Sequence, residues 1–286
     1  MLYNKVSEIM TTKLTTATVA NSIQEVVDMM VAADVGRIII TNKEIPVGIF
    51  TEKDVMKRVV NSNTDPGKSP IKDVMTSPIR AVREETPIVE ALGKMIRGKY
   101  RHLLVRGRRG KIVGIVSMRR ILGLAVELGQ GMNETKTLGS LVSGKALSVD
   151  ESASVAETID LMIQKGVAST IVSASGKPSG IFTERDVLKR VAAKGIDTKR
   201  TRVNQVMTAP LVTMVESALI GEALAEMYRR DIRNMPVVAR GGELIGILSM
   251  PDVLQFATAF NIDEKVRQAW KEVQEYYESE DQYTPG

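Results

Sequence analysis

A glycine-containing motif recurs four times at a fixed spacing, and this repeat constrains the fold more than any other feature of the chain. The four copies begin at Gly48, Gly114, Gly180 and Gly246, each 66 residues after the one before. The first copy, GIFTEKDVMKRV, closely matches the third, GIFTERDVLKRV, and VMTSP at 74–78 matches VMTAP at 206–210. A fixed period indicates a repeat architecture, here one in which a unit of two repeats was duplicated.

Each repeat predicts the same order of elements. A short β-rich run is followed by a helix with one apolar stripe, by two further β-rich runs that form a hairpin, and by a second helix after the glycine motif. In the first repeat the stripe consists of Ile23, Val26, Val27 and Met30. Ser22 with Glu25, and Ser154 with Glu157, predict capping boxes at two helix starts. We expect an α+β fold of four β-α-β-β-α repeats.

Polar and Gly-containing linkers set the expected boundaries. We expect repeats at 1–62, 63–127, 128–196 and 197–258, and a C-terminal helix and tail at 259–286. Residues 262–279 carry one apolar helical face, so this helix is expected to dock on a neighbouring module or subunit. The sequence leaves open whether the chain is a monomer or a homodimer.

The composition excludes several classes of site. The chain has no cysteine and one histidine, His102, which excludes thiol nucleophiles, thiolate zinc sites and paired-histidine metal sites. No repeated position offers a nucleophile with a positioned base, so we expect no enzyme. The sequence has no signal-like segment and no apolar run long enough to cross a membrane, so we expect a cytoplasmic protein without a membrane partner. The formal net charge of +5 favours anionic partners.

The repeated pattern hydrophobic-Gly-Ile-hydrophobic-[Thr/Ser]-x-x-Asp, which follows a β-α-β unit, resembles that of cystathionine-beta-synthase (CBS) domains over about residues 1–255. The resemblance implies that the four repeats pair into two modules, each with a pseudo-two-fold axis and known as a Bateman module. Two modules in one chain resemble the arrangement of the regulatory gamma subunit of AMP-activated protein kinase. The resemblance implies clefts that bind AMP, ADP or ATP as a regulatory ligand, with S-adenosylmethionine less favoured. It also implies a stand-alone sensor that acts through a protein partner still to be identified.

The chemistry of the motif is consistent with such a ligand. A carboxylate can accept hydrogen bonds from both hydroxyls of a ribose, which suits Asp54, Asp186 and Asp252. Hydroxyl and free N–H groups at a helix start can hold a phosphate oxygen, and the glycine allows the ligand to approach the strand closely. The same [Thr/Ser]-x-x-Asp pattern is also a capping box that needs no ligand. Both readings therefore stay open for each copy.

The resemblance also implies which residues meet across each cleft. It pairs Asp54 and Thr51 with Ala81, Asp186 and Thr183 with Thr213, Asp252 and Ser249 with Ser148, and the second motif with Thr16. Arg120 replaces the acid in that second motif and cannot accept from ribose, so we expect up to three nucleotide pockets. Cations at strand starts are expected to hold phosphate or to be exposed strand-end residues. The expected ligand residues are Thr16, Arg37, Gly48, Ile49, Thr51, Lys53, Asp54, Ala81, Arg101, His102, Ser117, Arg119, Arg120, Ser148, Gly180, Ile181, Thr183, Arg185, Asp186, Thr213, Arg233, Gly246, Ser249 and Asp252.

Two alternative functions remain. The basic loop 106–111 makes a nucleic-acid-binding protein possible, although a solvated turn is the simpler explanation of that loop. A scaffold without a ligand is the other alternative, and it predicts that changing Asp54, Asp186 or Asp252 affects only helix stability.

Overall fold

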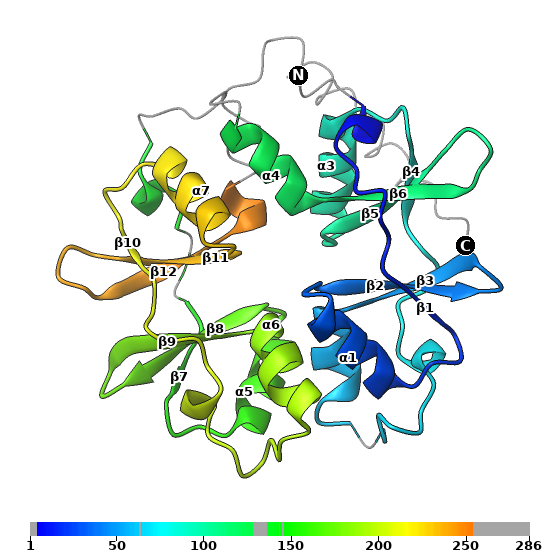
Figure 1. Cartoon of the computed structure of the whole chain (residues 1–286). Helices are drawn as coiled ribbons and strands as arrows, with labels where there is room; N and C mark the ends of the chain where they lie inside the picture. Colours follow the sequence, from blue (N-terminus) through cyan, green and yellow to red (C-terminus); the bar gives the residue numbers. More distant parts are fainter. Residues whose placement is uncertain (1–4, 63, 128–135, 143, 145, 254–286) are drawn as a thin grey trace, which may run out of the picture.

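One three-stranded sheet and its flanking helices make up each repeat in the computed structural model, which describes residues 5–62, 64–127, 136–142, 144 and 146–253 (Figure 1). Repeat 1 contains β1 (Thr16–Thr18), α1 (Ile23–Ala32), β2 (Arg37–Asn42), β3 (Ile45–Thr51) and α2 (Glu52–Asp54), which continues as a π-helix over Val55–Val59. Repeat 2 contains β4 (Ala81–Arg83), α3 (Ile88–Arg97), β5 (His102–Arg106), β6 (Ile112–Ser117) and α4 (Met118–Glu127). Repeat 3 contains β7 (Ser148–Asp150), α5 (Val155–Lys165), β8 (Ser169–Ala174), β9 (Lys177–Thr183) and α6 (Glu184–Asp186), with helical turns on to Lys194. Repeat 4 contains β10 (Met214–Val215), α7 (Ile220–Arg229), β11 (Asn234–Val238) and β12 (Leu244–Ser249), followed by helical residues 250–253.

These elements confirm the predicted α+β fold of four β-α-β-β-α repeats. The C-terminal helix predicted within 259–286 lies outside the described residues. Among the helices that the structure describes, none has the length and apolar character needed to cross a membrane.

The second strand is central in every sheet. It pairs in parallel with the first strand and antiparallel with the third. This register brings the end of the third strand beside the start of the second, so the motif hydroxyl of each repeat faces a residue at the start of the central strand. The four facing pairs are Thr51 with Arg37, Ser117 with His102, Thr183 with Ser169, and Ser249 with Asn234.

The helix starts and helix faces follow from local chemistry. Ser22 accepts a hydrogen bond from the Glu25 backbone N–H while Glu25 accepts one from Ser22, and Ser154 and Glu157 repeat this arrangement, so both predicted capping boxes are confirmed. The predicted stripe of α1 is buried, and α3, α5 and α7 also bury one apolar face each. Each first helix therefore packs through one apolar face.

A short leading segment ahead of each repeat packs on the neighbouring repeat of its pair. The segment at 5–11 forms β-bridges with repeat 2 at Pro87 and Ile115, whereas the segment around Ile71–Asp73 packs on repeat 1. The segments at 137–142 and 203–208 do the same for repeats 4 and 3. This reciprocal exchange ties repeats 1 and 2 into one module and repeats 3 and 4 into another.

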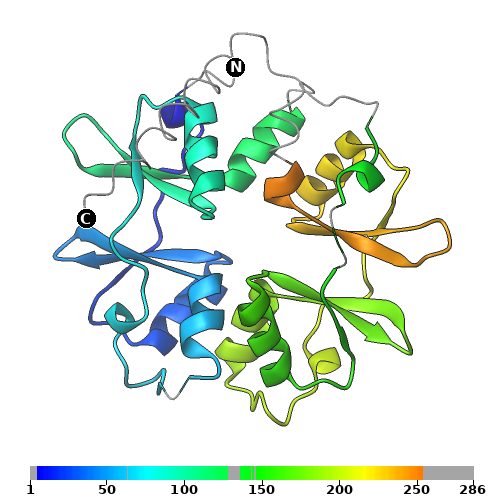
Figure 2. The same ribbon diagram turned by 180° about the vertical axis from the view of Figure 1, so that it is seen from behind.

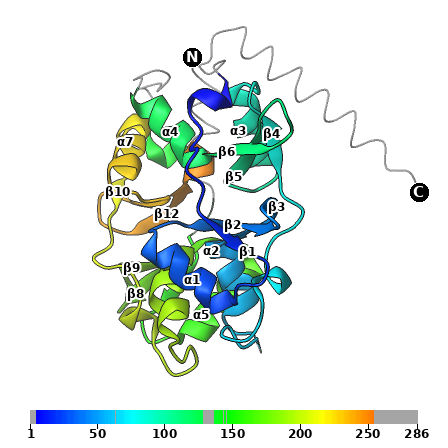
Figure 3. The same cartoon turned by 45° about the vertical axis from the view of Figure 1, so that its right-hand side comes forward.

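The four repeats form the quadrants of a disc. Repeats 1 and 2 occupy the right side of Figure 1 and repeats 3 and 4 the left, and Figure 2 gives the same arrangement from behind. Between the modules, the helices of repeats 1 and 3 share one apolar core, and α3, α4 and α7 of repeats 2 and 4 share another. Figure 3 shows repeats 2 and 4 stacked over repeats 1 and 3. The sheets lie across the middle of the disc, with α3, α4 and α7 on one side of them and α1 and α5 on the other.

Candidate functional site

In repeat 1 the motif aspartate is fully engaged within the protein. One oxygen of Asp54 accepts hydrogen bonds from the backbone N–H of Thr51 at 2.9 Å and from its hydroxyl at 2.6 Å. The other oxygen accepts from the Thr76 hydroxyl at 2.8 Å and lies 3.3 Å from the Arg58 guanidinium. Asp54 is 6% exposed. This copy of the motif is a capping box, reinforced by the leading segment of repeat 2.

The motif aspartate of repeat 3 has an equivalent environment. Asp186 accepts from the backbone and hydroxyl of Thr183, and its second oxygen accepts from the Thr208 hydroxyl at 2.8 Å and lies 3.2 Å from Arg190. A cavity of about 250 Å³ lies beside it, lined by Thr183, Thr208 and residues 230–234 of repeat 4, where the family resemblance had placed Thr213. Both oxygens of Asp186 are thus already engaged by groups of the protein itself.

The motif aspartate of repeat 4 is different. One oxygen of Asp252 accepts from the Ser249 backbone N–H at 2.9 Å and from its hydroxyl at 2.5 Å. No other described residue donates to this carboxylate, and the side chain is exposed. Asp252 therefore keeps an acceptor oxygen available.

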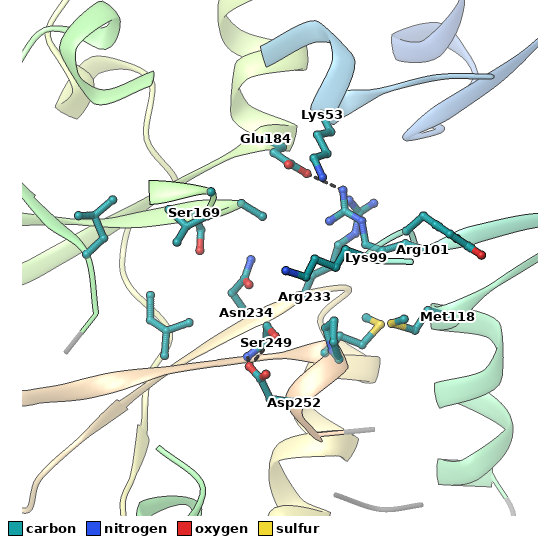
Figure 4. A pocket seen from close by; sticks show the side chains of 18 of the residues that line it. Lys53, Lys99, Arg101, Met118, Ser169, Glu184, Arg233, Asn234, Ser249 and Asp252 are labelled. Carbon is teal, nitrogen blue, oxygen red and sulfur yellow. Dashed lines mark hydrogen bonds and ion pairs between the residues drawn. The ribbon is translucent and has the colours of Figure 1, made fainter. Parts of the chain in front are cut away.

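Asp252 lies at one end of a cavity of about 470 Å³ that begins between repeats 3 and 4 and reaches the centre of the disc. Ala146, Leu147 and Ile247 supply part of its apolar wall. Figure 4 shows Asp252 and Ser249 at one end and Lys53, Arg101 and Arg233 at the other. The cavity therefore joins a hydrogen-bond acceptor, an apolar wall and a cationic end.

The cationic end is built from both modules. Lys53 comes from repeat 1, Lys99 and Arg101 come from repeat 2, and Arg233 comes from repeat 4. Lys53 and Lys99 form no ion pair with any residue that the structure describes. Their ammonium groups are available to an anion in the cavity.

Two buried carboxylates hold the arginines of this end. Glu184 accepts a hydrogen bond from Arg101 at 2.5 Å, and Glu52 accepts one from Arg233. Arg185 lies 3.5 Å from Glu52. Glu52 is 2% exposed and Glu184 4% exposed. Because the members of each pair belong to different modules, the pairs cross the disc diagonally.

Positive charge exceeds negative charge at the centre of the disc. Burial, with Arg37, Arg101 and Arg233, lowers the pKa of His102 well below its ordinary value, so the imidazole is neutral near pH 7. Burial and the nearby Arg233 also lower the pKa of Arg37. The charged groups gathered here are the guanidinium groups of Arg37, Arg101, Arg119, Arg185 and Arg233 and the carboxylates of Glu52, Glu184 and Asp231, the last paired with Arg119 and Arg185. This potential favours an anionic ligand.

Several predicted ligand residues have other contacts. The motif glycines face side chains of the leading segments, because a Cβ on Gly48, Gly180 or Gly246 would overlap Met75, Met207 or Val142. Ile49 and Ile181 bridge to Thr76 and Thr208 in the same segments. The glycines therefore make room for packing within each module.

The remaining predicted residues lie along the sheets. Thr16 pairs with Ile39 and Ala81 with Leu104 in strand register, and Ser148 shares a hydrogen bond with Ser173. Thr213 directly precedes β10. Ser117 accepts from the backbone N–H of Arg120 at 3.2 Å, which caps α4. None of these five positions lines the Asp252 cavity, where Ala146 and Leu147 stand in place of the predicted Ser148.

Sequence reasoning missed the carboxylates Glu52 and Glu184 and the cation Lys99. The signal for the first two was present, since both copies of Thr-Glu-x-Asp carry a glutamate that the cap does not need. In the basic loop, Arg108 lies 3.5 Å from Glu85 and 3.7 Å from Glu84, as expected of a solvated turn.

Comparison with known proteins is consistent with this geometry. The CBS domain family matches residues 6–61, 71–127, 138–193 and 203–259. The CBS domain-containing protein CBSCBSPB1 of Arabidopsis thaliana is 26% identical over 86% of this chain and 52% of its own length. The chain spans about half the length, or less, of the curated relatives it matches first.

Two solved structures are also similar. Protein MJ1225 from Methanocaldococcus jannaschii, described as a proposed archaeal homologue of g-AMPK, is 16% identical with a TM-score of 0.76 over 88% of this chain and 99% of its own. CBS domain protein PAE2072 from Pyrobaculum aerophilum, complexed with AMP, is 26% identical with a TM-score of 0.39 over 43% of this chain and 98% of its own.

Proposed function

The chain belongs to the CBS-domain family, and from that premise we propose that it binds an adenosine nucleotide in the cavity between repeats 3 and 4 and signals its presence to a protein partner. The observation that carries this proposal is the open carboxylate of Asp252 at one end of a cavity whose other end is cationic. A nucleotide likewise carries ribose hydroxyls that can donate to a carboxylate and a phosphate that can pair with cations.

The dimensions and chemistry of the cavity support a ligand of this size. Sites for small ligands commonly measure about 300–1,000 Å³ and combine apolar walls with a few polar groups, and this cavity has about 470 Å³. The free oxygen of Asp252 would accept from the ribose hydroxyls, in charge-assisted hydrogen bonds of about 1.5–3 kcal/mol each. Leu147 and Ile247 would contact the base. The cations at the other end would contact the phosphate; they are Lys53, Lys99, Arg101 and Arg233.

We propose one principal nucleotide site rather than three. Asp54 and Asp186 each accept from two threonines and lie beside an arginine, so a ribose would have to displace internal hydrogen bonds to reach them. Breaking a buried hydrogen bond costs about 1–3 kcal/mol. AMP, ADP and ATP are the candidate ligands, and S-adenosylmethionine is disfavoured because it brings a cation to a cationic end.

We propose a regulatory rather than a catalytic role for these residues. Among the residues that the structure describes as lining the cavity, Ser249 is the hydroxyl next to Asp252, and it donates to that carboxylate within a helix cap. A capping serine with no imidazole beside it lacks the base that nucleophilic catalysis requires. The effect of the ligand would be exerted through a partner that distinguishes the occupied disc from the empty one.

Calorimetric titration with AMP, ADP, ATP and S-adenosylmethionine tests the proposal. We expect Asp252→Asn to weaken nucleotide binding by about tenfold or more. Asp150→Asn is the matched control, because Asp150 is another exposed carboxylate bonded to a neighbouring serine, Ser152, and lies outside the cavity. Absence of nucleotide binding by the wild type, or equal binding by both variants, would refute the site.

A further inference from the structure

We propose that Glu184 and Glu52 compete with the ligand's phosphate for the arginines of the cavity, so that binding exchanges a contact between the two modules for a contact with the ligand. This inference rests on the proposed function, because the competing anion is the phosphate of the bound nucleotide. It assigns a role to two buried carboxylates that the repeat fold itself does not need.

Arg101 and Arg233 are bonded to glutamates and are at the same time accessible from the cavity. Arg101 donates to Glu184 at 2.5 Å, yet both side chains line the cavity. Arg233 donates to Glu52 and also lines it. A guanidinium group carries five N–H donors, so it can be approached by a phosphate while it is still bonded to a carboxylate. The phosphate and the glutamate therefore bind the same guanidinium group.

The two pairs are equivalent by the internal duplication. Glu52 and Glu184 are 132 residues apart in the sequence, and so are Arg101 and Arg233. Each glutamate is the first residue of its short helix, directly after the capping threonine, and caps nothing itself. At the surface, the first residue of a helix could be one of many types. Here, however, both carboxylates are almost completely buried, each against an arginine of the other module.

The sign of the effect follows from the burial of the pairs. Removing one charge from a buried ion pair leaves its partner uncompensated. If Glu184 loses its charge, Arg101 is left as such a partner at the edge of the cavity, and a phosphate becomes its replacement counter-ion. The negative charge of Glu184, which itself lines the cavity, no longer repels that phosphate. Both effects tighten binding.

This exchange of contacts also explains how ligand binding could change the arrangement of the two modules. Arg101 belongs to the module of repeats 1 and 2, and Glu184 to that of repeats 3 and 4. A phosphate that draws Arg101 away from Glu184 weakens this ion pair between the modules. A contact between Arg101 and the phosphate takes its place. The relative position of the modules thus responds to the phosphate charge in the cavity.

Glu184→Gln tests the competition, because glutamine keeps the shape of the side chain and one acceptor for Arg101 but removes the charge. We expect this variant to bind AMP and ATP about tenfold more tightly than the wild type, with a larger ligand-induced increase in Tm. Glu157→Gln is the control, since glutamine also completes a capping box and Glu157 lies on α5, outside the cavity. Glu52→Gln examines the second pair and serves in place of the first variant if that one does not fold.

The direction of the change separates the outcomes. Equal or weaker binding by the folded Glu→Gln variants, with binding by the wild type intact, would mean that the glutamates only position the arginines and would overturn the inference. Failure of the wild type itself to bind any adenosine nucleotide would instead overturn the proposed function, and the inference with it.

Discussion

Replacing Gly180 with alanine tests whether the repeated glycine serves packing or ligand approach. A Cβ at this position would overlap the sulfur of Met207 and lie 2.9 Å from the backbone oxygen of Thr208. The methionine can move, but Thr208 cannot withdraw easily, because its backbone N–H and oxygen form hydrogen bonds of 2.8 and 3.0 Å with Ile181. Overpacking costs about 1–3 kcal/mol and a lost hydrogen bond about 1 kcal/mol. We therefore expect Gly180→Ala to lower the free energy of unfolding by about 2–4 kcal/mol.

Urea denaturation followed by circular dichroism measures this effect. Gly67→Ala is the control, because the nearest atom to a Cβ there is an Asp65 oxygen at 3.4 Å and its φ is not positive. Alanine at such a site leaves stability unchanged or raises it slightly through the unfolded state. If Gly180→Ala were as stable as the control but bound nucleotide weakly, the glycine would serve ligand approach and the packing argument would be wrong.

Two further predictions concern the buried carboxylate of Asp186 and the half-buried imidazole of His102. Thr208→Val removes the hydroxyl that donates to Asp186 at 2.8 Å, so we expect a loss of about 1–3 kcal/mol in urea denaturation, and no loss would mean that water replaces the hydroxyl. The pKa of His102 is lowered in the folded protein below its ordinary value of 6.5, so the unfolded chain binds the proton more readily and stability falls as the pH drops below about 6.5. His102→Asn, which copies Asn234 at the equivalent position, should flatten this fall in a series of melting temperatures between about pH 7 and pH 5. If the variant kept the same pH profile, the loss of stability at low pH would come from titratable groups other than His102.

The repeat period and the apolar stripes are sufficient to predict the four β-α-β-β-α repeats, because both can be read directly from the spacing of residues in the sequence. The exchange of leading segments is not predictable in the same way. Val6 and Ile71 are apolar and must be buried, but periodicity does not say on which repeat. The same limit applies to the motif aspartates, since Asp54 and Asp252 share the [Thr/Ser]-x-x-Asp motif and differ in which groups from elsewhere in the chain contact them.

The two modules differ at the positions that would decide ligand binding. Ile115 is 3% exposed and packs with Ile39 and Leu104 in an apolar cluster between the sheets of repeats 1 and 2. Its counterpart 132 residues later, Ile247, is only partly buried and lines the cavity. In the first module, hydrophobic packing therefore fills the space between the sheets, whereas in the second module the equivalent space is part of the cavity.

The charges at these equivalent positions have diverged in a complementary way. Arg120 stands where the second module has Asp252, and a guanidinium group cannot accept hydrogen bonds from a ribose. The first module instead contributes cations to the cavity of the second, through Lys53 and Arg101. On the function proposed above, one module holds the sugar and base while the other supplies counter-charge for the phosphate. A ligand bound in this way contacts both halves of the disc, which is the condition under which its binding can change how the halves meet.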